Sequence, residues 1–350
     1  MDFYRKDALN AIREGATAAD LQADARYKDF LKSESFLIEA VHQNPMFIEG
    51  LHEPSEDVMV AAVETDDTGK VFRQCTCVLW RQTEKVCLAA VRECPKNLSY
   101  VARQTPEICM AAIEGWPENE YSGFAITDVK KEFRTPELIL KAVTKTEVAI
   151  NFVPGDELND EICMAAIQHF PDDVLNIRDY PVTVEMYSAA LHRQEELLQK
   201  RITDAKADGR ELTDTERDGI ATVMSCFSAD VFDRLKEADI VQMMKLDPLN
   251  LRFVPIDRMR SSVITAALRK SGMAIQYVPE PKLSQKMCES AVKQAPQAIK
   301  FIPRQFITQS LMKLILEDPS EMDMLADILA VEPEANLLEL CKEMGMQLKN

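Results

Sequence analysis

Cysteine is the residue type in this sequence whose number most suggests chemistry, because nine cysteines could hold a metal ion or form disulfides. Cys75 and Cys77 form a C-x-C pair, but this pair lacks a partner histidine or a second cysteine pair, so it is a weak signal for zinc. Four other cysteines each lie three residues before a small residue in similar segments, which is typical of a buried helix face: Cys87, Cys109, Cys163 and Cys288. We therefore expect reduced thiols, no metal and no cofactor.

The histidines and carboxylates carry no recognisable catalytic pattern. His42, His52, His169 and His192 form no HExxH motif and no close pair, and no serine lies in a GxSxG turn. His42 and His169 lie at the predicted ends of helices, where a partly charged imidazole suits the helix dipole. A catalytic site could be assembled from scattered carboxylates such as Asp172, Asp173 and Asp179, but repeated segments make scattered carboxylates inevitable. We therefore do not predict an enzyme.

The charge is acidic overall and unevenly distributed. The net charge of −17 and the pI near 4.8 disfavour direct nucleic-acid binding. Residues 151–250 hold 10 Lys and Arg against 21 Asp and Glu, whereas residues 251–300 hold 9 against 3. This reversal of sign is the strongest functional signal in the sequence. The alternative is that residues 251–300 form an ordinary solvated surface whose charge has changed sign without a functional reason.

We call the basic segment and its edge the basic island; its members are Arg252, Arg258, Arg260, Arg269, Lys270, Lys282, Lys286, Lys293, Lys300 and Arg304. The candidate partner-binding residues are Arg258, Arg260, Arg269, Lys270, Lys286, Lys293, Lys300 and Arg304. Arg269 and Lys293 are 24 residues apart, so a repeat of that length would place them side by side as a ridge with Lys270 adjacent. The expected occupant is an acidic partner, or the acidic residues 151–250 of a second copy.

The elements that must position these side chains come from an internal repeat. TPEICMAAIEGWP (Thr105–Pro117) returns as NDEICMAAIQHFP (Asn159–Pro171), and looser copies occur elsewhere. A small residue five places before the proline defines what we call the marker position: Ala40, Ala90, Ala112, Ala166 and Ala291, with Ala62, Ala142, Ala190, Ala267, Met243 and Leu314 in copies that lack the proline or the small residue. The steps of 22 to 30 residues are typical of solenoids.

Each repeat has the signals of two helices. Thr105, Thr135 and Asn159 are N-cap residue types, and Pro106 and Pro136 suit the first helical position. A proline stops the first helix, and a short apolar run closed by Val-Pro or Ile-Pro follows. The frame predicts an all-α protein, an α-solenoid of about twelve two-helix repeats with terminal capping helices.

This frame resembles a family of bacterial and phage helical repeats that is catalogued only as a domain of unknown function. The matching segments are Ala89–Pro95, Ala142–Pro154, Ala267–Pro279 and Ala291–Pro303, and the resemblance covers roughly residues 33 to 320. It implies a helical array and interaction roles in secreted or phage-borne proteins, and it provides no catalytic residues to transfer.

The expected organisation is a helical cap over residues 1–32, a first array over 33–200 and a polar linker or inserted loop over 201–218. A second array then covers 219–332, and a capping helix covers 333–350. Thr213 and Glu216 form a capping box that restarts a helix after the turn pair Asp208-Gly209. The apolar runs are too short for a membrane span, and residues 1–30 do not read as a signal peptide, so we expect a cytoplasmic location in the producing cell or an infected host.

A protein-binding scaffold fits these observations best, and a bacterial effector or a phage-encoded inhibitor that sequesters a host protein belongs to this class. The alternative is an acidic DNA mimic that blocks a nucleic-acid-binding protein. The acidic charge supports this alternative, whereas the basic island and the ordinary charged content of 28% oppose it. The partner's identity and homo-oligomerisation stay open.

Overall fold

The computed structural model describes residues 2–76, 82–117, 124–308, 310–311 and 314 of the 350. The chain divides into two compact units, Met1–Pro181 and Val182–Asn350, which are treated separately below. Both are all-α, and no strand occurs in the described residues. Within the same residues, no helix is both long and apolar enough to cross a bilayer.

The first unit begins with a helical cap and continues as repeats. The cap contains α1 (Asp2–Arg13), α2 (Ala18–Ala23) and the 3₁₀ turn η1 (Phe30–Lys32). Arg5 and Arg13 fasten α1 to the first repeat through hydrogen bonds to Glu39 (2.7 Å) and Gln43 (2.8 Å). The long helices of the repeats are α3 (Glu34–Gln43), α4 (Glu56–Thr65), α5 (Glu84–Glu93), α6 (Pro106–Gly115), α8 (Pro136–Lys145) and α9 (Asp160–His169).

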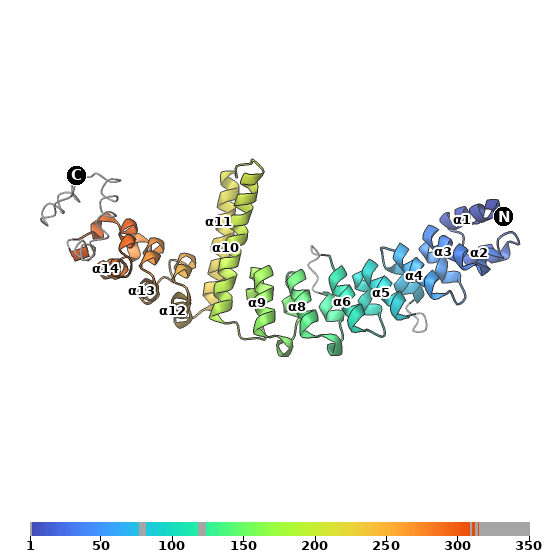
Figure 1. The fold of residues 1–350 in the computed structure, drawn as a ribbon, viewed down its shortest axis with the longest axis horizontal. Coiled ribbons are helices and arrows are strands. Elements are labelled where there is room, and N and C mark those ends of the chain that lie inside the picture. The colour runs from blue at the N-terminus through green and yellow to red at the C-terminus, as the bar shows by residue number, and fades with distance from the viewer. Residues whose placement is uncertain (1, 77–81, 118–123, 309, 312–313, 315–350) are drawn as a thin grey trace. The chain divides into compact units, whose positions relative to one another are not determined.

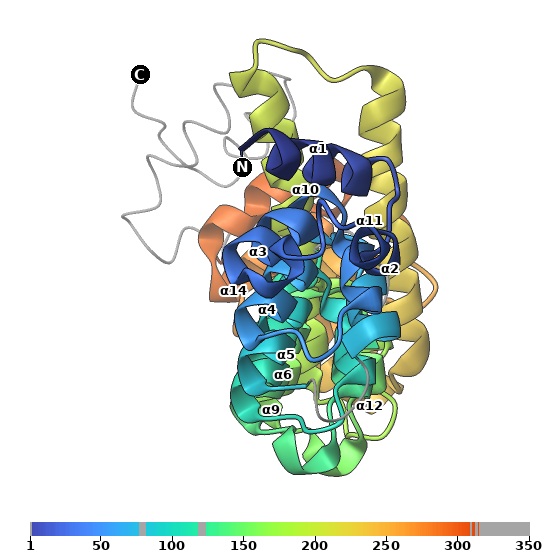
Figure 2. The same ribbon diagram turned by 90° about the vertical axis from the view of Figure 1, so that its right-hand side faces the viewer.

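The second element of most repeats is a 3₁₀ helix rather than an α-helix. These short elements are η2 (Pro45–Gly50), η3 (Phe72–Thr76, a π turn), η5 (Pro95–Tyr100), α7 (Phe124–Asp128), η6 (Lys131–Phe133), η7 (Ala149–Phe152), η8 (Gly155–Glu157) and η9 (Pro171–Leu175). Where a proline occupies the first position of the short element, it ends the preceding α-helix. The few residues that remain before the next repeat form only a short, tight helix. In the first unit, α3, α4, α5, α6 and α9 stand one behind another in one layer, with the short elements in the other (Figure 2).

The predicted caps and marker positions are confirmed, except that the marker residue Leu314 is only half-buried. Thr105, Thr135 and Asn159 each accept a hydrogen bond from the backbone N–H three residues later, which satisfies a donor that the helix start leaves free. The small residues at the marker position are buried because two helices approach closely there: Ala40, Ala62, Ala90, Ala112, Ala142, Ala166, Ala190, Ala267 and Ala291, as is Met243.

Hydrogen bonds between neighbouring repeats hold the α-helices parallel. Near the N-termini, the cap hydroxyl of one repeat donates to the first-turn glutamate of the preceding repeat: Thr105 Oγ1 to Glu84 (3.2 Å) and Ser55 Oγ to Glu34. Near the C-termini, Lys145 Nζ donates to the carbonyl of Glu114 in the preceding repeat. Since both kinds of link join like ends, all helix N-termini lie along one edge of the layer.

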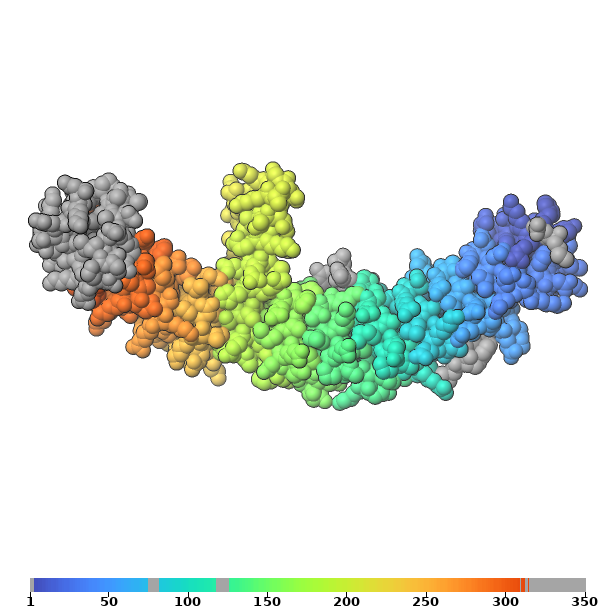
Figure 3. Space-filling model, in the orientation of Figure 1, coloured from blue at the N-terminus to red at the C-terminus, as the bar shows by residue number. Residues whose placement is uncertain are grey.

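The second unit begins with a long helical hairpin, α10 (Val184–Ala207) and α11 (Asp214–Arg234). The predicted capping box of Thr213 and Glu216 starts α11. The gap between marker residues Ala190 and Met243, which has room for two repeats, is thus filled by this hairpin. Its outer half stands clear of the rest of the unit (Figures 1 and 3), where most of residues 199–226 are exposed or half-buried.

Within the described residues, three repeats follow the hairpin. Their α-helices are α12 (Glu237–Leu246), α13 (Ser261–Lys270) and α14 (Gln285–Gln294), and their 3₁₀ turns are η10 (Pro248–Phe253), η11 (Gly272–Tyr277), η12 (Glu280–Lys282), η13 (Pro296–Phe301) and η14 (Arg304–Phe306). Lys270 Nζ donates to the carbonyls of Lys245 (2.5 Å) and Leu246 (3.1 Å), which is the same link between C-termini as in the first unit.

The organisation expected from sequence differs from the structure in the middle of the chain. The two units divide after Pro181 rather than near residue 200, and residues 201–207 continue α10. The linker predicted over 201–218 is therefore the two helix ends and the turn of the hairpin. The capping helix predicted over 333–350 lies outside the described residues.

Candidate interaction surfaces

The cysteines that share the repeat slot are buried as the sequence predicts. Burial raises the pKa of four thiols to about 11: Cys87, Cys109, Cys163 and Cys288. A raised pKa leaves little thiolate, which is the form that attacks electrophiles and binds metals. Cys226 on the hairpin is exposed instead. The side chains of the C-x-C pair lie outside the described residues, as does Trp80, whereas Trp116 is buried in the repeat interior.

The three carboxylates considered for catalysis do not form a common site. Asp173 is fully buried in η9, whereas Asp172 and Asp179 are exposed. Burial, together with nearby Glu147 and Asp172, raises the pKa of Asp173 to about 7. Its Oδ1 accepts hydrogen bonds from the Val148 N–H (3.1 Å) and from Asn176 (3.2 Å).

One histidine joins a polar cluster that the sequence does not reveal. His192 Nε2 lies 3.1 Å from Asp247 Oδ2, and its Nδ1 lies 3.1 Å from Arg252, which also pairs with Glu195 at 2.5 Å. These contacts fix α10 against η10 and place Arg252 in the fold rather than on a binding surface. His42 and His169 occupy the last turns of α3 and α9, as predicted.

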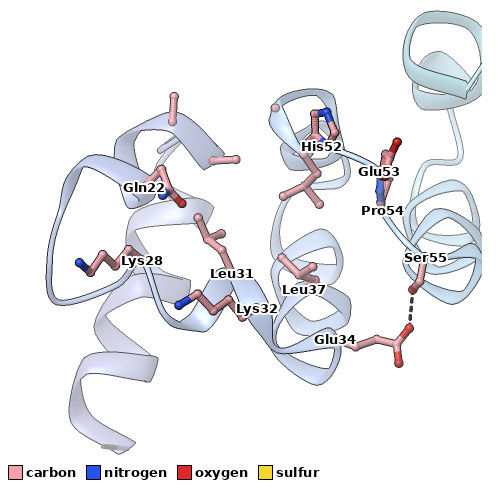
Figure 4. Close-up of a pocket in the computed structure, with 14 residues that line it drawn as sticks. Gln22, Lys28, Leu31, Lys32, Glu34, Leu37, His52, Glu53, Pro54 and Ser55 are labelled. Carbon is pink, nitrogen blue, oxygen red and sulfur yellow. Dashed lines mark hydrogen bonds between the residues drawn. The ribbon is translucent and has the colours of Figure 1, made fainter.

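A cavity of about 520 Å³ opens between α2 and η2. Figure 4 shows Lys28 and Lys32 on one side of it and His52 with Glu53 on the other. Lys32 pairs with Asp29 at 2.8 Å, and Glu34 accepts the hydrogen bond from Ser55. The charged groups therefore do not converge on a common point inside the cavity.

Several members of the basic island contact the helix that precedes them in the unit. Arg258 donates to the carbonyl of Leu235 and lies 3.5 Å from Asp233, and Arg260 lies 3.2 Å from Glu237. Lys270 is occupied by the helix-end carbonyls described above. Three of the eight predicted partner-binding residues, Arg258, Arg260 and Lys270, thus already have a contact within the chain. Lys286, Lys300 and Arg304 are exposed in α14, η13 and η14, and Arg269 and Lys293 are exposed in the last turns of α13 and α14.

The predicted ridge has a third member. Lys245 occupies the place in α12 that Arg269 and Lys293 occupy in α13 and α14, two residues after the marker position. We call these three residues the basic ridge. Lys245, Arg269, Lys270, Ser261 and Ser262 line a shallow groove of about 780 Å³ between α12 and α13. The ridge thus runs along the helical layer of this unit with one cation per repeat.

The first unit has an apolar feature that the sequence analysis missed. Two residues before the marker position, all six repeats carry an apolar side chain that is only half-buried: Ile38, Val60, Leu88, Met110, Leu140 and Met164. Because consecutive helices pack side by side in one orientation, we describe these residues as the apolar stripe. The same place in the three repeats of α12, α13 and α14 holds Val241, Thr265 and Glu289, also half-buried, so packing between repeats does not require an apolar residue there.

Carboxylates border the apolar stripe. Every α-helix of the stripe has an acidic first turn, and the exposed members include Glu34, Glu56, Glu84, Glu107, Glu137, Asp160 and Glu161. An anion at this end is favoured by the helix dipole, so helix stability accounts for part of the pattern. The result is an acidic edge along the stripe.

Comparisons of the chain with protein-family models, with curated proteins and with solved structures give no match.

Proposed function

We propose that this protein is a non-enzymatic scaffold that binds a protein segment along the apolar stripe of its first unit. The observation that carries the proposal is the run of six half-buried apolar residues at a position where the second unit has Val241 once but tolerates Thr265 and Glu289 in the next two repeats. Packing between repeats does not dictate the residue type at this position. Its apolar character in six successive repeats therefore supports a role in contact with another molecule.

The border of the stripe indicates the chemistry of the partner. An occupant that buries the stripe also faces the acidic first turns, so apolar side chains flanked by Lys or Arg suit both features. Fully burying an exposed Leu, Ile or Met side chain contributes about 1.5–3 kcal/mol. Since the stripe residues are already half-buried, each has roughly half of that left to contribute, and several repeats must act together.

The test compares two variants of the full chain as bait in a lysate, with captured proteins identified by mass spectrometry. The stripe variant carries Met110→Ser, Leu140→Ser and Met164→Ser. The control carries Val241→Ser, which removes a half-buried apolar residue at the same place in the second unit. We expect the wild type and the control to capture the same partner and the stripe variant to lose it while keeping its helical circular dichroism.

A second measurement distinguishes this mode of binding from a purely electrostatic one. Titration calorimetry with the captured partner at several temperatures should give a negative heat-capacity change, which marks burial of apolar surface. Undiminished capture by the stripe variant would reject the stripe as the binding surface.

A further inference from the structure

The basic ridge is free to meet an external partner. Lys245, Arg269 and Lys293 are exposed, and their charged groups form no ion pair with any residue that the structure describes. This separates them from Arg258 and Arg260, which pair with carboxylates of the preceding helices α11 and α12. The ridge lies in a positive region, since residues 237–306 hold 11 Lys and Arg against 6 Asp and Glu.

The first unit offers a complementary set of charges. Glu107, Glu137 and Glu161 occupy the same place in α6, α8 and α9, five residues before the marker position, and we call them the acidic row. All three are exposed, and within the described parts of the chain none forms an ion pair. The unit around them is strongly negative, because residues 1–181 hold 19 Lys and Arg against 32 Asp and Glu.

The two sets of charges also share a spacing. Each is made of one residue per helix, on parallel helices that pack directly against one another, and packed helices lie about 8–10 Å apart. Three cations and three carboxylates therefore repeat at nearly the same interval. From this match in sign, number and spacing we infer that the basic ridge docks on the acidic row of a second copy of this chain.

The contact joins two different surfaces of the chain. Two copies that each dock a ridge on the other's row form a closed two-fold pair, whereas a copy that docks only one of its surfaces leaves the other free, and association then continues from copy to copy. Exposed ion pairs add little individually and weaken as salt rises, so the assembly is weak and sensitive to ionic strength. The inference does not rest on the apolar stripe.

The experiment is sedimentation velocity of the full chain over a range of concentrations at about 20 mM and about 500 mM salt, where the screening length falls severalfold. We expect the wild type to sediment faster as concentration rises at low salt and as a single small species at high salt. A ridge variant with Lys245→Glu, Arg269→Glu and Lys293→Glu should stay small at both. A row variant with Glu107→Lys, Glu137→Lys and Glu161→Lys should behave in the same way.

Mixing the two variants gives the decisive measurement. The unchanged row of the ridge variant meets the unchanged ridge of the row variant, and their reversed surfaces also match, so the mixture should regain association. A control with Lys282→Glu, Lys286→Glu and Lys300→Glu makes the same change in net charge outside the ridge and should keep association. The inference is overturned if the wild type stays monomeric at low salt, if the control loses association as fully as the ridge variant, or if the mixture fails to regain it. Replacing the ridge residues with Gln gives a milder variant for the same comparison if the reversed chain does not fold.

Discussion

Asn97 and Asp173 occupy the same place in two different repeats, seven residues after the marker position. Asn97 donates a hydrogen bond of 3.0 Å from Nδ2 to the carbonyl of its own marker residue, Ala90. Asn250 makes the same bond to Met243 at 3.4 Å. Asp173 has an oxygen, Oδ2, where these residues have an amide group, and this buried oxygen has no hydrogen-bond partner in the described chain. A protonated Asp173 would restore the missing donor.

Replacing Asp173 with Asn should therefore stabilise the protein near neutral pH. The pKa of Asp173 is raised to about 7 in the folded chain, above the usual value near 3.8, so folding takes up a proton between these pH values. The stabilisation of the fold by protonated Asp173 is complete below about pH 4. It declines as the pH rises to about 7, by about 4 kcal/mol at most. Thermal unfolding should show a large gain for Asp173→Asn at pH 8 and a clearly smaller gain at pH 5.

The reverse substitution provides the control for this prediction. Asn97→Asp should lower the melting temperature at pH 8 more than at pH 5, because it places a carboxylate at the same buried position. Asn151→Asp changes an exposed residue and should have little effect at either pH. Equal melting temperatures of the wild type and Asp173→Asn at pH 8 would contradict the assignment.

Ala166→Asp should unfold at least the repeats around α9. Ala166 is fully buried where two helices meet, and an unpaired charge there costs several kcal/mol, comparable to the stability of a marginal protein. The control is Ala165→Asp, one residue earlier on the half-buried side of the same helix. Urea unfolding should show a much lower midpoint for Ala166→Asp than for Ala165→Asp, and similar midpoints would mean that the marker position is wrongly assigned.

Cys226 should react before the cysteines of the repeat slot. Its thiol is exposed, whereas Cys109 and Cys163 are buried with pKa values raised to about 11, so at pH 8 about one in a thousand of the buried thiols is ionised. Brief alkylation of the folded protein followed by peptide mapping should label the peptide with Cys226 and spare those with Cys109 and Cys163. Early labelling of Cys163 would show that α9 opens readily.

Two glycine substitutions should have opposite effects. A Cβ on Gly272 would lie 2.1 Å from the carbonyl oxygen of Ala291, so Gly272→Ala should strongly destabilise the second unit. A Cβ on Gly219 in α11 meets no atom within 4 Å, so Gly219→Ala should stabilise the hairpin by about 0.5–1 kcal/mol. Thermal unfolding of both variants tests this steric explanation. A general preference for alanine in helices would instead predict a gain in stability at both sites.

The repeat explains how much of the fold is predictable from sequence. Small residues at a fixed period can only mark close helix contacts, so the burial of Ala112 and Ala166 follows from spacing alone. The hairpin cannot be predicted from this spacing. The outer parts of α10 and α11 bury few side chains, so their polar sequence is typical of a linker.

The interaction surfaces were harder to predict for a different reason. Composition identifies the basic island but not its pairing with other elements, in which Arg252, Arg258 and Arg260 lie beside Glu195, Asp233 and Glu237. Lys245 lies outside the basic segment and becomes part of the ridge only when it is aligned with Arg269 and Lys293. The apolar stripe reads as core in the sequence, since Met110 and the buried Ile113 differ only in which side of one helix they occupy.

The links between neighbouring helix N-termini make the array modular in length. Each link, such as that from Thr105 to Glu84, involves only adjacent repeats, so no repeat depends on its distance from the ends of the unit. Excising residues 83–104 would remove one complete 22-residue repeat. Thr105 would then follow Gln82 directly and take the place that the N-cap residue Thr83 has now. The stripe would become shorter by one residue, Leu88, with its remaining members still in register. The number of repeats therefore acts as a ruler that sets how long a segment the protein can hold.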